Sequence, residues 1–566
     1  MLLAYAIEPY ADFTLPANRQ RQQEAVDAVR GELGRDYNNW IAGRAVQTGQ
    51  WLASVNPSQP TEIIGRHSKA DAVQARQAVE DAHAYCSEWA FTPVEQRVEI
   101  LVKTAAILRA RKFEFNAWLI LEAGKSFAEA EAETAEAIDF CEYYARQMLR
   151  YAAPDPVVQI PGEKNEMVYL PLGAGVVIPP WNFPLAILAG TTVAALVCGN
   201  TVVLKPSSET PIIAAKFVQA LHEAGLPPRA LNLCVGSGAE VGDTLVTHPK
   251  TRFISFTGSR EIGLRINELA AKPQPGCIWI KRVVAEMGGK DAILVDEDAD
   301  IEAAATGVVQ SAFGFQGQKC SACSRAIVHE AVYDQFLELV KAKTEAFPRG
   351  PVISAKAKQT ITQYIETGKA EGRLITGGTE PGGDGYFVEP TVIADVDRKA
   401  RIFQEEIFGP VLAVTKARDF DHGLELVNDS DYGLTGAAYT RNPAKLEKAR
   451  RHFHVGNLYL NRKCTGAMVG AHPFGGFNMS GTDSKAGGPD YLLQFLQAKS
   501  IAEKIGSPPQ PRRPQNSTRY SRRAPPGPGA ETFSGTPRLA DARCSVTPSE
   551  ATRPFPSHSP AGSVFG

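Results

Sequence analysis

The hydrophobic and polar positions of this chain follow two different periodicities. In residues 71–89, 95–123 and 128–151, apolar side chains recur every three or four positions, which predicts three amphipathic helices. After residue 168 the pattern changes, and short apolar runs such as 175–178 alternate with longer helical patterns. Strands that alternate with helices in this way indicate βαβ units and parallel sheets.

The alternation forms two successive series, which predict an α/β fold of two tandem Rossmann-like domains with parallel sheets. The first series predicts strands at 175–178, 201–204, 230–235 and 253–256, and helices from about 185 and at 211–224, 238–247 and 260–271. The second predicts strands at 292–295 and 324–329 and helices at 301–315 and 332–347, with further units to about 495. Residues 16–35 are polar and helix-favouring, which predicts a surface helix before both series.

The composition changes near residue 506. Residues 507–566 contain 12 of the 39 prolines, eight arginines, no lysine and three acidic residues, a net charge of +5. The whole chain carries −2, which leaves −7 on residues 1–506. Because the segment lacks apolar periodicity, we predict that it is a disordered tail. It is either a native extension or the product of out-of-frame reading of a GC-rich gene.

Charge and cysteine content narrow the function classes. Residues 1–506 are acidic, so we predict no nucleic-acid partner and no membrane partner. The first residues lack the basic segment of a signal peptide, and the most apolar stretch, 186–204, is interrupted by glycine, threonine and asparagine. Nine cysteines in 566 residues are too few for a disulfide framework, so we expect reduced thiols in a cytoplasmic protein.

A cysteine motif, GQKCSAC at 317–323, is the first candidate for chemistry. A single C-x-x-C pair could be redox-active or half of a zinc site. Structural zinc needs four ligands, and the sequence offers no second pair, so we predict no metal. Cys320 is then either a small core residue or a nucleophile. Glu286, just before Gly288 and Gly289, is either a turn residue or a base that activates a thiol or a water.

Three further segments lie where predicted strands end. PWNFP at 180–184 contains the amide of Asn182, which could face a developing oxyanion. KPSSETP at 205–211 follows a strand at the carboxyl end of the sheet, where open α/β sheets bind ligands. FTGSREIG at 256–263 opens a helix whose first N–H groups favour a phosphate, although a plain helix cap at Ser259 explains the same residues.

Taken together, these motifs resemble the aldehyde dehydrogenase superfamily over about residues 40–505. In chain order they are PWNFP (180–184), KPSSETP (205–211), FTGS (256–259), EMGGK (286–290), GQKC (317–320), EEIFGP (405–410) and PFGGFNMSG (473–481). Within the superfamily, GFQGQKCSA (314–322), HVGNLYLNRKCTGAMVG (454–470) and PFGGFNMSGTDSKAGG (473–488) look like the branch that oxidises L-glutamate γ-semialdehyde to L-glutamate with NAD, the second oxidation of proline breakdown.

The resemblance implies a catalytic role for three residues. Cys320 would attack the aldehyde carbon as a thiolate and give a thiohemiacetal, which becomes a thioester after hydride transfer. Asn182 and the Cys320 N–H would bind the oxyanion, and Glu286 would activate the water that hydrolyses the thioester. Cys323 is expected to be a packing thiol.

The resemblance also implies an NAD site across the first domain. Lys205 would hold the adenosine ribose, Ser259 the pyrophosphate, and Glu406 with Phe408 the nicotinamide ribose. The residues expected at the cofactor are Pro179, Trp181, Lys205, Ser208, Gly258, Ser259, Met287, Glu406 and Phe408. Ser208 stands where strict NAD enzymes of the superfamily often carry Glu, and a hydroxyl would not repel a 2′-phosphate. We therefore expect NAD with some tolerance of NADP.

The implied substrate site combines N–H donors, charges and aromatic walls. The expected residues are Glu136, Phe183, Lys319, Ser321, Gly466, Ala467 and Phe474. The Gly466 and Ala467 N–H groups would bind the α-carboxylate, and Glu136 would meet the α-ammonium. For Lys319 and Glu136, a solvated surface charge is the alternative. Two other functions remain open: a dehydrogenase of another carboxylated aldehyde such as succinate semialdehyde, and a non-enzymatic binding or structural protein on this fold.

Domain boundaries follow from the same resemblance. They give an N-terminal helical segment at 1–39, an NAD-binding domain at 40–151 and 172–283, and a catalytic domain at 284–489. A β-flap at 152–171 and a terminal strand within 490–506 would pair across subunits, so we expect a homodimer or larger homo-oligomer, with proline dehydrogenase as a pathway partner. The stretch before 350–353 is about ten residues shorter than usual in the family, which trims a surface loop or alters the packing nearby.

Overall fold

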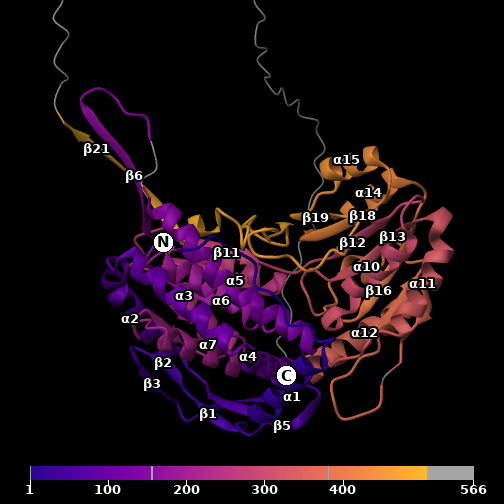
Figure 1. Cartoon of the computed structure of the whole chain (residues 1–566), viewed down its shortest axis with the longest axis horizontal. Helices are drawn as coiled ribbons and strands as arrows, with labels where there is room; N and C mark the ends of the chain where they lie inside the picture. Colours follow the sequence, from indigo (N-terminus) through magenta and orange to yellow (C-terminus); the bar gives the residue numbers. More distant parts are fainter. Residues whose placement is uncertain (1, 154–156, 380, 506–566) are drawn as a thin grey trace, which may run out of the picture. The chain divides into compact units, whose positions relative to one another are not determined.

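The computed structural model describes residues 2–153, 157–379 and 381–505. The predicted disordered tail at 507–566 lies outside the described residues. Two seven-stranded sheets form the centres of the described chain, as the alternating pattern predicted (Figure 1).

The first sheet has the order β11-β10-β7-β8-β9-β2-β3. Its five parallel strands are β7 (Ala174–Ile178), β8 (Thr201–Leu204), β9 (Leu231–Leu233), β10 (Phe253–Thr257) and β11 (Arg282–Glu286). At one edge, β2 (Asn39–Ile41) and β3 (Arg44–Val46) run antiparallel, so the sheet is mixed rather than wholly parallel. The boundary expected at 283 falls within β11.

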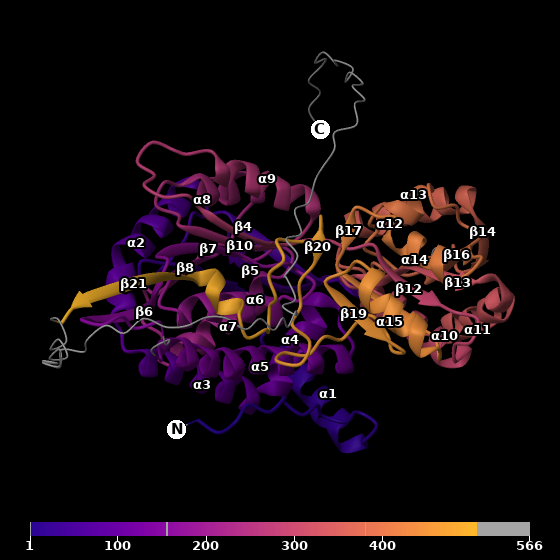
Figure 2. The ribbon, with the colours of Figure 1, turned by 90° about the horizontal axis from the view of Figure 1, so that it is seen from above.

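Helices cover both faces of this sheet, and alternate strand residues enter different cores. Val176 and Val203 pack in one hydrophobic cluster with α2 (Ala72–Ala90). Val177 and Val202 pack in another, with α5 (Phe127–Ala152), α6 (Ala186–Val197) and α7 (Pro211–Glu223). Such two-sided burial explains why these strands are continuous apolar runs. The helices α8 (Asp243–Thr247) and α9 (Arg260–Ala271) complete this part of the chain (Figure 2).

The second sheet has the order β14-β15-β16-β13-β12-β18-β19. Its strands are β12 (Asp291–Val295), β13 (Cys323–His329), β14 (Arg373–Thr376), β15 (Thr391–Ala394), β16 (Val411–Ala417), β18 (Thr435–Tyr439) and β19 (Asn457–Leu460), all parallel to their neighbours except β14. One face packs on α10 (Ile301–Phe313) and α11 (Tyr333–Glu345), and the other on α12 (Ala355–Glu371), α13 (Arg401–Gln404), α14 (Phe420–Asn428) and α15 (Pro443–His452).

Three small sheets complete the described fold. A three-stranded sheet, β1 (Arg35–Tyr37), β5 (Gln59–Ser68) and β4 (Trp51–Asn56), was not predicted, because its strands are short or mostly polar. A two-stranded ribbon pairs β6 (Glu163–Pro171) with β21 (Leu496–Lys504), where the flap and terminal strand were expected (Figure 1). The last sheet pairs β17 (Tyr432–Gly433) with β20 (Phe477–Asn478).

Two helix predictions were wrong in their bounds. The helix predicted at 95–123 is two helices, α3 (Val94–Ala110) and α4 (Lys112–Ala123), because Arg111 has a non-helical φ of −108° and ψ of 23°. The helix predicted at 301–315 ends at Phe313. Phe315, Gln316 and Gly317 then take left-handed φ values of 51°, 53° and 66°, which side chains disfavour by about 1–2 kcal/mol per residue. This turn leads directly to Cys320.

The N-terminal part is helical only at α1 (Pro16–Arg30), which packs against α4; residues 2–12 before it form no helix or strand. None of the described helices is long and apolar enough to cross a membrane.

Candidate active site

The nucleophile loop, residues 314–320, is fixed by the buried side chain of Gln318. Its amide donates to the carbonyls of Phe315 and Pro351 at 3.3 and 3.4 Å and accepts the Ile353 N–H at 2.8 Å. The stretch around 350–353 therefore contacts the loop directly. The shortening predicted there would border the nucleophile loop as well as the surface.

Asn182 lies beside this loop, at the end of β7. Its Nδ2 atom donates to the Gln318 carbonyl at 2.9 Å, which leaves one amide hydrogen free to meet an oxyanion. Glu133 of α5 stabilises the turn that follows Asn182. It accepts the N–H groups of Leu185 and Ala186 at 2.8 and 3.2 Å where α6 begins. The buried Asn182 amide therefore contacts the nucleophile loop at Gln318, two residues before Cys320.

Cys320 sits among carboxylates. Burial raises the pKa of its thiol well above the usual range, and the nearby carboxylates of Asp291, Glu406 and Glu286 raise it further. The Cys320 carbonyl packs against Gly289. A Cβ at Gly289 would collide with that carbonyl and would lie 2.5 Å from the Asp291 carboxylate. The thiol is therefore neutral at rest, and attack on an aldehyde requires a base to remove its proton.

Glu286, the last residue of β11, is a half-buried carboxylate held by a loop of the second domain. It accepts hydrogen bonds from the Ser484 hydroxyl at 2.6 Å and from the Gly476 N–H at 3.1 Å. Burial raises its pKa to about 8, although both hydrogen bonds lower it. No hydrogen bond among the described residues joins it to Cys320, so the side chain must turn from Ser484 to act near the thiol.

Glu406 rests on the paired glycines that follow Glu286. It accepts the Gly289 N–H at 3.0 Å, and a Cβ on Gly288 would collide with its carboxylate. Burial raises the pKa of Glu406 to about 7. The close approach of this carboxylate therefore requires glycine at 288, whereas the Cys320 carbonyl and the Asp291 carboxylate require it at 289.

Several residues predicted at the cofactor have defined contacts within the described chain. The rings of Trp181 and Phe408 meet edge to face with centroids 5.6 Å apart, so the structure brings these two together. Ser259 caps α9 by accepting the Ile262 N–H at 3.4 Å, next to Gly258. Met287 is buried and its N–H donates to the Ser480 carbonyl at 2.7 Å.

Lys205 follows β8 and is almost unpartnered. It is buried, and the one hydrogen bond of its ammonium within the described residues is a long contact of 3.4 Å with the Pro206 carbonyl. Burial lowers its pKa to about 8. Ser208, nearby, donates to the Gly236 carbonyl at 3.4 Å, and Pro179 is buried where β7 ends. A buried ammonium with spare donors fits a ligand that supplies oxygen acceptors, as the ribose of NAD would.

Two predicted substrate-side residues, Phe183 and Lys319, lie near Lys125, a buried lysine that was not predicted. The ammonium of Lys125 lies 4.3 Å from the ring centroid of Phe183 and 3.7 Å from that of Phe315, and it pairs with Glu133 at 3.0 Å. Burial lowers the pKa of Lys319, which also lies near Lys125. Ser321 is buried, and its carbonyl accepts hydrogen bonds from the side chains behind it.

Glu136, on the same helix as Glu133, is partly exposed. Burial raises its pKa to about 8, and the neighbouring carboxylates of Glu133 and Asp139 add to the shift. An ammonium group placed beside it would relieve this repulsion, as an α-amino acid substrate would do.

The predicted carboxylate-binding loop, residues 462–470, is fixed at its start by Arg462, which donates to the carbonyls of Thr465 and Gly466 at 3.1 and 3.2 Å. Within the described residues, no hydrogen bond uses the N–H groups of Gly466 and Ala467. Phe474 and Ala486 exchange two backbone hydrogen bonds of 2.8 Å, which close the loop that holds Glu286.

Several contributors escaped the sequence analysis. They are Gln318, Ser484, Lys125, Glu133 and the buried pair Lys290–Asp291. The Lys290 ammonium has no hydrogen-bond partner among the described residues, and burial lowers its pKa to about 7. Two of these had a visible signal: Gln318 and Lys290 belong to the GQKC and EMGGK motifs.

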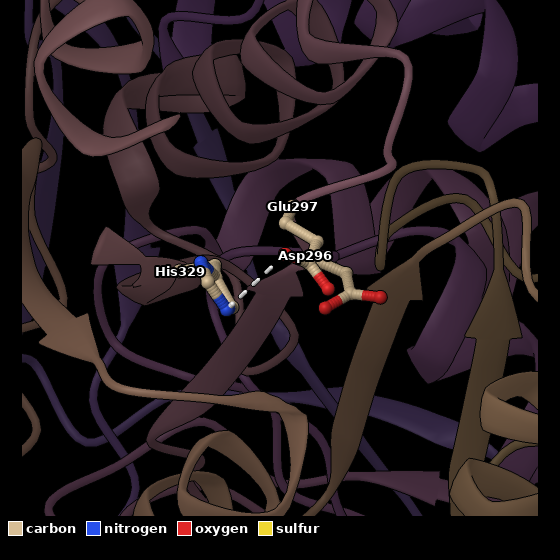
Figure 3. A group of neighbouring side chains, drawn as sticks. All are labelled: Asp296, Glu297 and His329. Carbon is tan, nitrogen blue, oxygen red and sulfur yellow. Dashed lines mark ion pairs between the residues drawn. The ribbon is translucent and has the colours of Figure 1, made fainter. Parts of the chain in front are cut away.

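One cluster has the residue types of a metal site. Asp296, Glu297 and His329 lie together where β12 and β13 end (Figure 3). However, the Lys445 ammonium already lies 2.7 Å from Asp296 and 3.3 Å from Glu297 and pairs with both carboxylates. The arrangement is explained as an ion-pair cluster.

Comparison with known proteins gives consistent results. The sequence model of the aldehyde dehydrogenase family matches residues 42–501. The chain is 60% identical to a 1-pyrroline-5-carboxylate dehydrogenase of Geobacillus thermodenitrificans over 89% of this chain and 100% of that protein. The crystal structure of 1-pyrroline-5-carboxylate dehydrogenase from Thermus with bound NAD superposes with a TM-score of 0.88 at 50% identity, over 89% of this chain and 99% of that one.

A larger protein is also similar. Proline utilization A from Bdellovibrio bacteriovorus superposes with a TM-score of 0.88 at 41% identity, over 90% of this chain and 54% of that one. The predicted superfamily and fold are thereby confirmed: the chain belongs to the aldehyde dehydrogenase family.

Proposed function

We propose that this protein is an NAD-dependent dehydrogenase that oxidises L-glutamate γ-semialdehyde, the open form of 1-pyrroline-5-carboxylate, to L-glutamate. The observation that carries the proposal is the 60% identity, over the whole of the relative, to an enzyme named for that substrate. The geometry supports it, because the Asn182 amide donates to the loop that carries the Cys320 thiol, and the Glu286 carboxylate is near enough to raise the pKa of that thiol.

The chain's own residues can perform each acyl step. The Cys320 proton passes to solvent and the thiolate attacks the aldehyde carbon, while the free hydrogen of the Asn182 amide and the Cys320 N–H stabilise the oxyanion. NAD, held by the residues named below, would supply the hydride acceptor that converts the thiohemiacetal to a thioester. Glu286 then removes a proton from water, which attacks the thioester and releases L-glutamate and the Cys320 thiol.

The residues that would hold NAD carry donors and acceptors that match its ribose and pyrophosphate groups. Lys205 offers spare N–H donors for ribose hydroxyls, Ser259 and Gly258 lie at the start of α9 for the pyrophosphate, and Glu406 would accept from the nicotinamide ribose. Ser208, a neutral residue beside Lys205, supports some tolerance of NADP.

The assay is NADH formation by the purified full-length protein with γ-semialdehyde and with succinate semialdehyde, which lacks the α-amino group. We expect a kcat/KM at least about 100-fold higher for γ-semialdehyde, because its ammonium would pair with Glu136. Equal values or a preference for succinate semialdehyde would contradict the proposed substrate. The same assay with NADP in place of NAD measures the cofactor tolerance.

The partners follow from chemistry and from one exposed ribbon. An enzyme that oxidises proline to 1-pyrroline-5-carboxylate must supply the substrate, and the similar proline utilization A chain is about twice as long as the matched region. An isolated two-stranded ribbon such as β6–β21 is marginally stable alone, which supports pairing with another subunit. The cytoplasmic location stays a prediction.

A further inference from the structure

Residues 2–13, which we call the N-terminal strap, precede the part of the chain that matches the family and run along α5, from Tyr143 to Glu131. The strap is fixed by Glu8, which is only 7% exposed and pairs with Arg109 at 2.8 Å and with Lys112 at 3.0 Å. The Glu8 N–H also donates to the Asp139 carboxylate of α5 at 2.8 Å. A buried charge with two cationic partners gives the strap one defined path.

Tyr5 joins the strap to the carboxylate-binding loop. Its hydroxyl donates to the Val469 carbonyl at 3.1 Å, and its ring meets that of Tyr143 edge to face at 5.1 Å. The next residue, Gly470, has a φ of +78°, and a Cβ there would lie 3.0 Å from the Tyr5 ring and 3.1 Å from the Tyr143 ring. The loop is therefore packed closely against Tyr5.

This contact lies at the far end of the loop from Arg462. Arg462 fixes the carbonyls of Thr465 and Gly466, whereas Tyr5 fixes Val469, two residues after Ala467. The two N–H groups without partners in the described structure, those of Gly466 and Ala467, lie between these fixed points. Tyr5 thus limits how the pair can be oriented.

The strap also borders the predicted ammonium site. Burial raises the pKa of Tyr10 to about 12, and the carboxylate of Glu136 contributes next, followed by those of Asp139 and Glu131. Glu131 in turn accepts the Ala11 N–H at 2.8 Å. The carboxylate and the ammonium of an α-amino acid bound here would therefore both lie near the strap.

We propose that the N-terminal strap is part of the aldehyde site, and that Tyr5 is a positioning residue for the loop that binds the substrate α-carboxylate. The proposal rests on the proposed function. It assigns substrate specificity to a segment outside the family match, acting through the Tyr5 hydroxyl on the Val469 carbonyl.

Tyr5→Phe tests this, because it keeps the ring and removes only the hydroxyl. We expect the KM for γ-semialdehyde to rise about five- to tenfold, the usual effect of one lost hydrogen bond. The kcat, the KM for NAD and the kinetics with butanal, which has no α-carboxylate, should stay unchanged. Tyr151→Phe is the matched control, since the Tyr151 hydroxyl donates to the Pro489 carbonyl at 3.0 Å, away from this loop.

The outcomes are distinct. If wild-type protein oxidises γ-semialdehyde and Tyr5→Phe leaves its KM unchanged, the proposal is overturned. Equal losses with γ-semialdehyde and butanal, or a joint loss of kcat and NAD affinity, would also overturn it, because Tyr5 would then be structural. If wild-type protein oxidises butanal but not γ-semialdehyde, the proposed function fails first and the role of Tyr5 fails with it.

Discussion

The nucleophile loop and the cofactor side of the site satisfy their polar groups in opposite ways. In the nucleophile loop, Gln318 uses both ends of its amide, and Asn182 donates to the loop backbone. On the predicted cofactor side, Lys205 is buried, and its ammonium makes one long hydrogen bond among the described residues. Groups that meet short-lived charge are oriented in advance by the protein, whereas groups that meet a bound ligand are left for that ligand to satisfy.

The described chain contains two kinds of hydrogen-bonded carboxylate. Glu133 and Glu122 are buried carboxylates that cap α6 and α7, each accepting two backbone N–H groups. Glu286 is half-buried and accepts one backbone N–H and the Ser484 hydroxyl, which can rotate away, whereas Glu122 accepts the Ser54 hydroxyl in addition to its two backbone N–H groups. The predictions below change one member of such a pair and use the other as the control.

The largest effect is expected for Cys320→Ala. Removal of the nucleophile should lower kcat by at least about 10⁴-fold, because no covalent intermediate can form. Cys323→Ala, three residues later in the buried start of β13, should keep activity within a few-fold. Steady-state NADH formation measures both variants, and comparable losses would contradict the assignment of Cys320.

Glu286→Gln should come next. Steady-state turnover should fall about 10²- to 10⁴-fold, the usual contribution of a general base. Glu122→Gln is the control: it should lower the melting temperature, because Glu122 caps α7, and leave kcat nearly unchanged. The reverse pattern would show that Glu286 is a structural carboxylate.

Ala467→Asp should raise the KM for γ-semialdehyde about 30- to 100-fold, since it places a carboxylate beside the substrate carboxylate. Ala471→Asp adds the same charge to an exposed position four residues later and should have little effect. A normal KM in the first variant would remove Ala467 from the substrate site.

Lys205→Ala should raise the KM for NAD about 10- to 30-fold with no change in the KM for the aldehyde. Lys216 is also buried in the first domain, but it pairs with Glu32 at 3.3 Å, so Lys216→Ala should alter stability and not cofactor affinity. Kinetics and thermal melts on both variants distinguish a ligand-binding lysine from a structural one.

The smallest effect concerns pH. Only the deprotonated Glu286 carboxylate can accept a proton, and its pKa is raised to about 8, so turnover should rise with pH and level off above about 8. Ser484→Ala removes a hydrogen bond that lowers this pKa, so its profile should move to higher pH. Coincident profiles would argue against Glu286 as the base.

The sequence predicted the alternating elements well because buried parallel strands are apolar throughout. β8 and α9 have the bounds expected from the pattern. The strands at 35–68 were missed, since strands with an exposed face carry polar residues and lack a continuous apolar run. The break at Arg111 was missed because the apolar spacing continues across it.

The candidate site shows a similar division. The family motifs contain Cys320, Glu286 and Asn182, and their roles stay predictions until tested. The supporting residues Lys125, Glu133 and Ser484 act through contacts between segments distant in the chain, such as the 2.6 Å bond from Ser484 to Glu286. Local patterns carry no record of such contacts, and neither did they indicate that Tyr5 reaches Val469.

The central claim is covalent catalysis on L-glutamate γ-semialdehyde by Cys320, and intact mass of the Glu286→Gln variant tests it most directly. After mixing with NAD and γ-semialdehyde, the slow hydrolysis should leave a glutamyl thioester, seen as one added acyl group that peptide mapping places on Cys320. One NADH should form for each acyl group. An unmodified chain, or an acyl group on Cys323, would contradict the account.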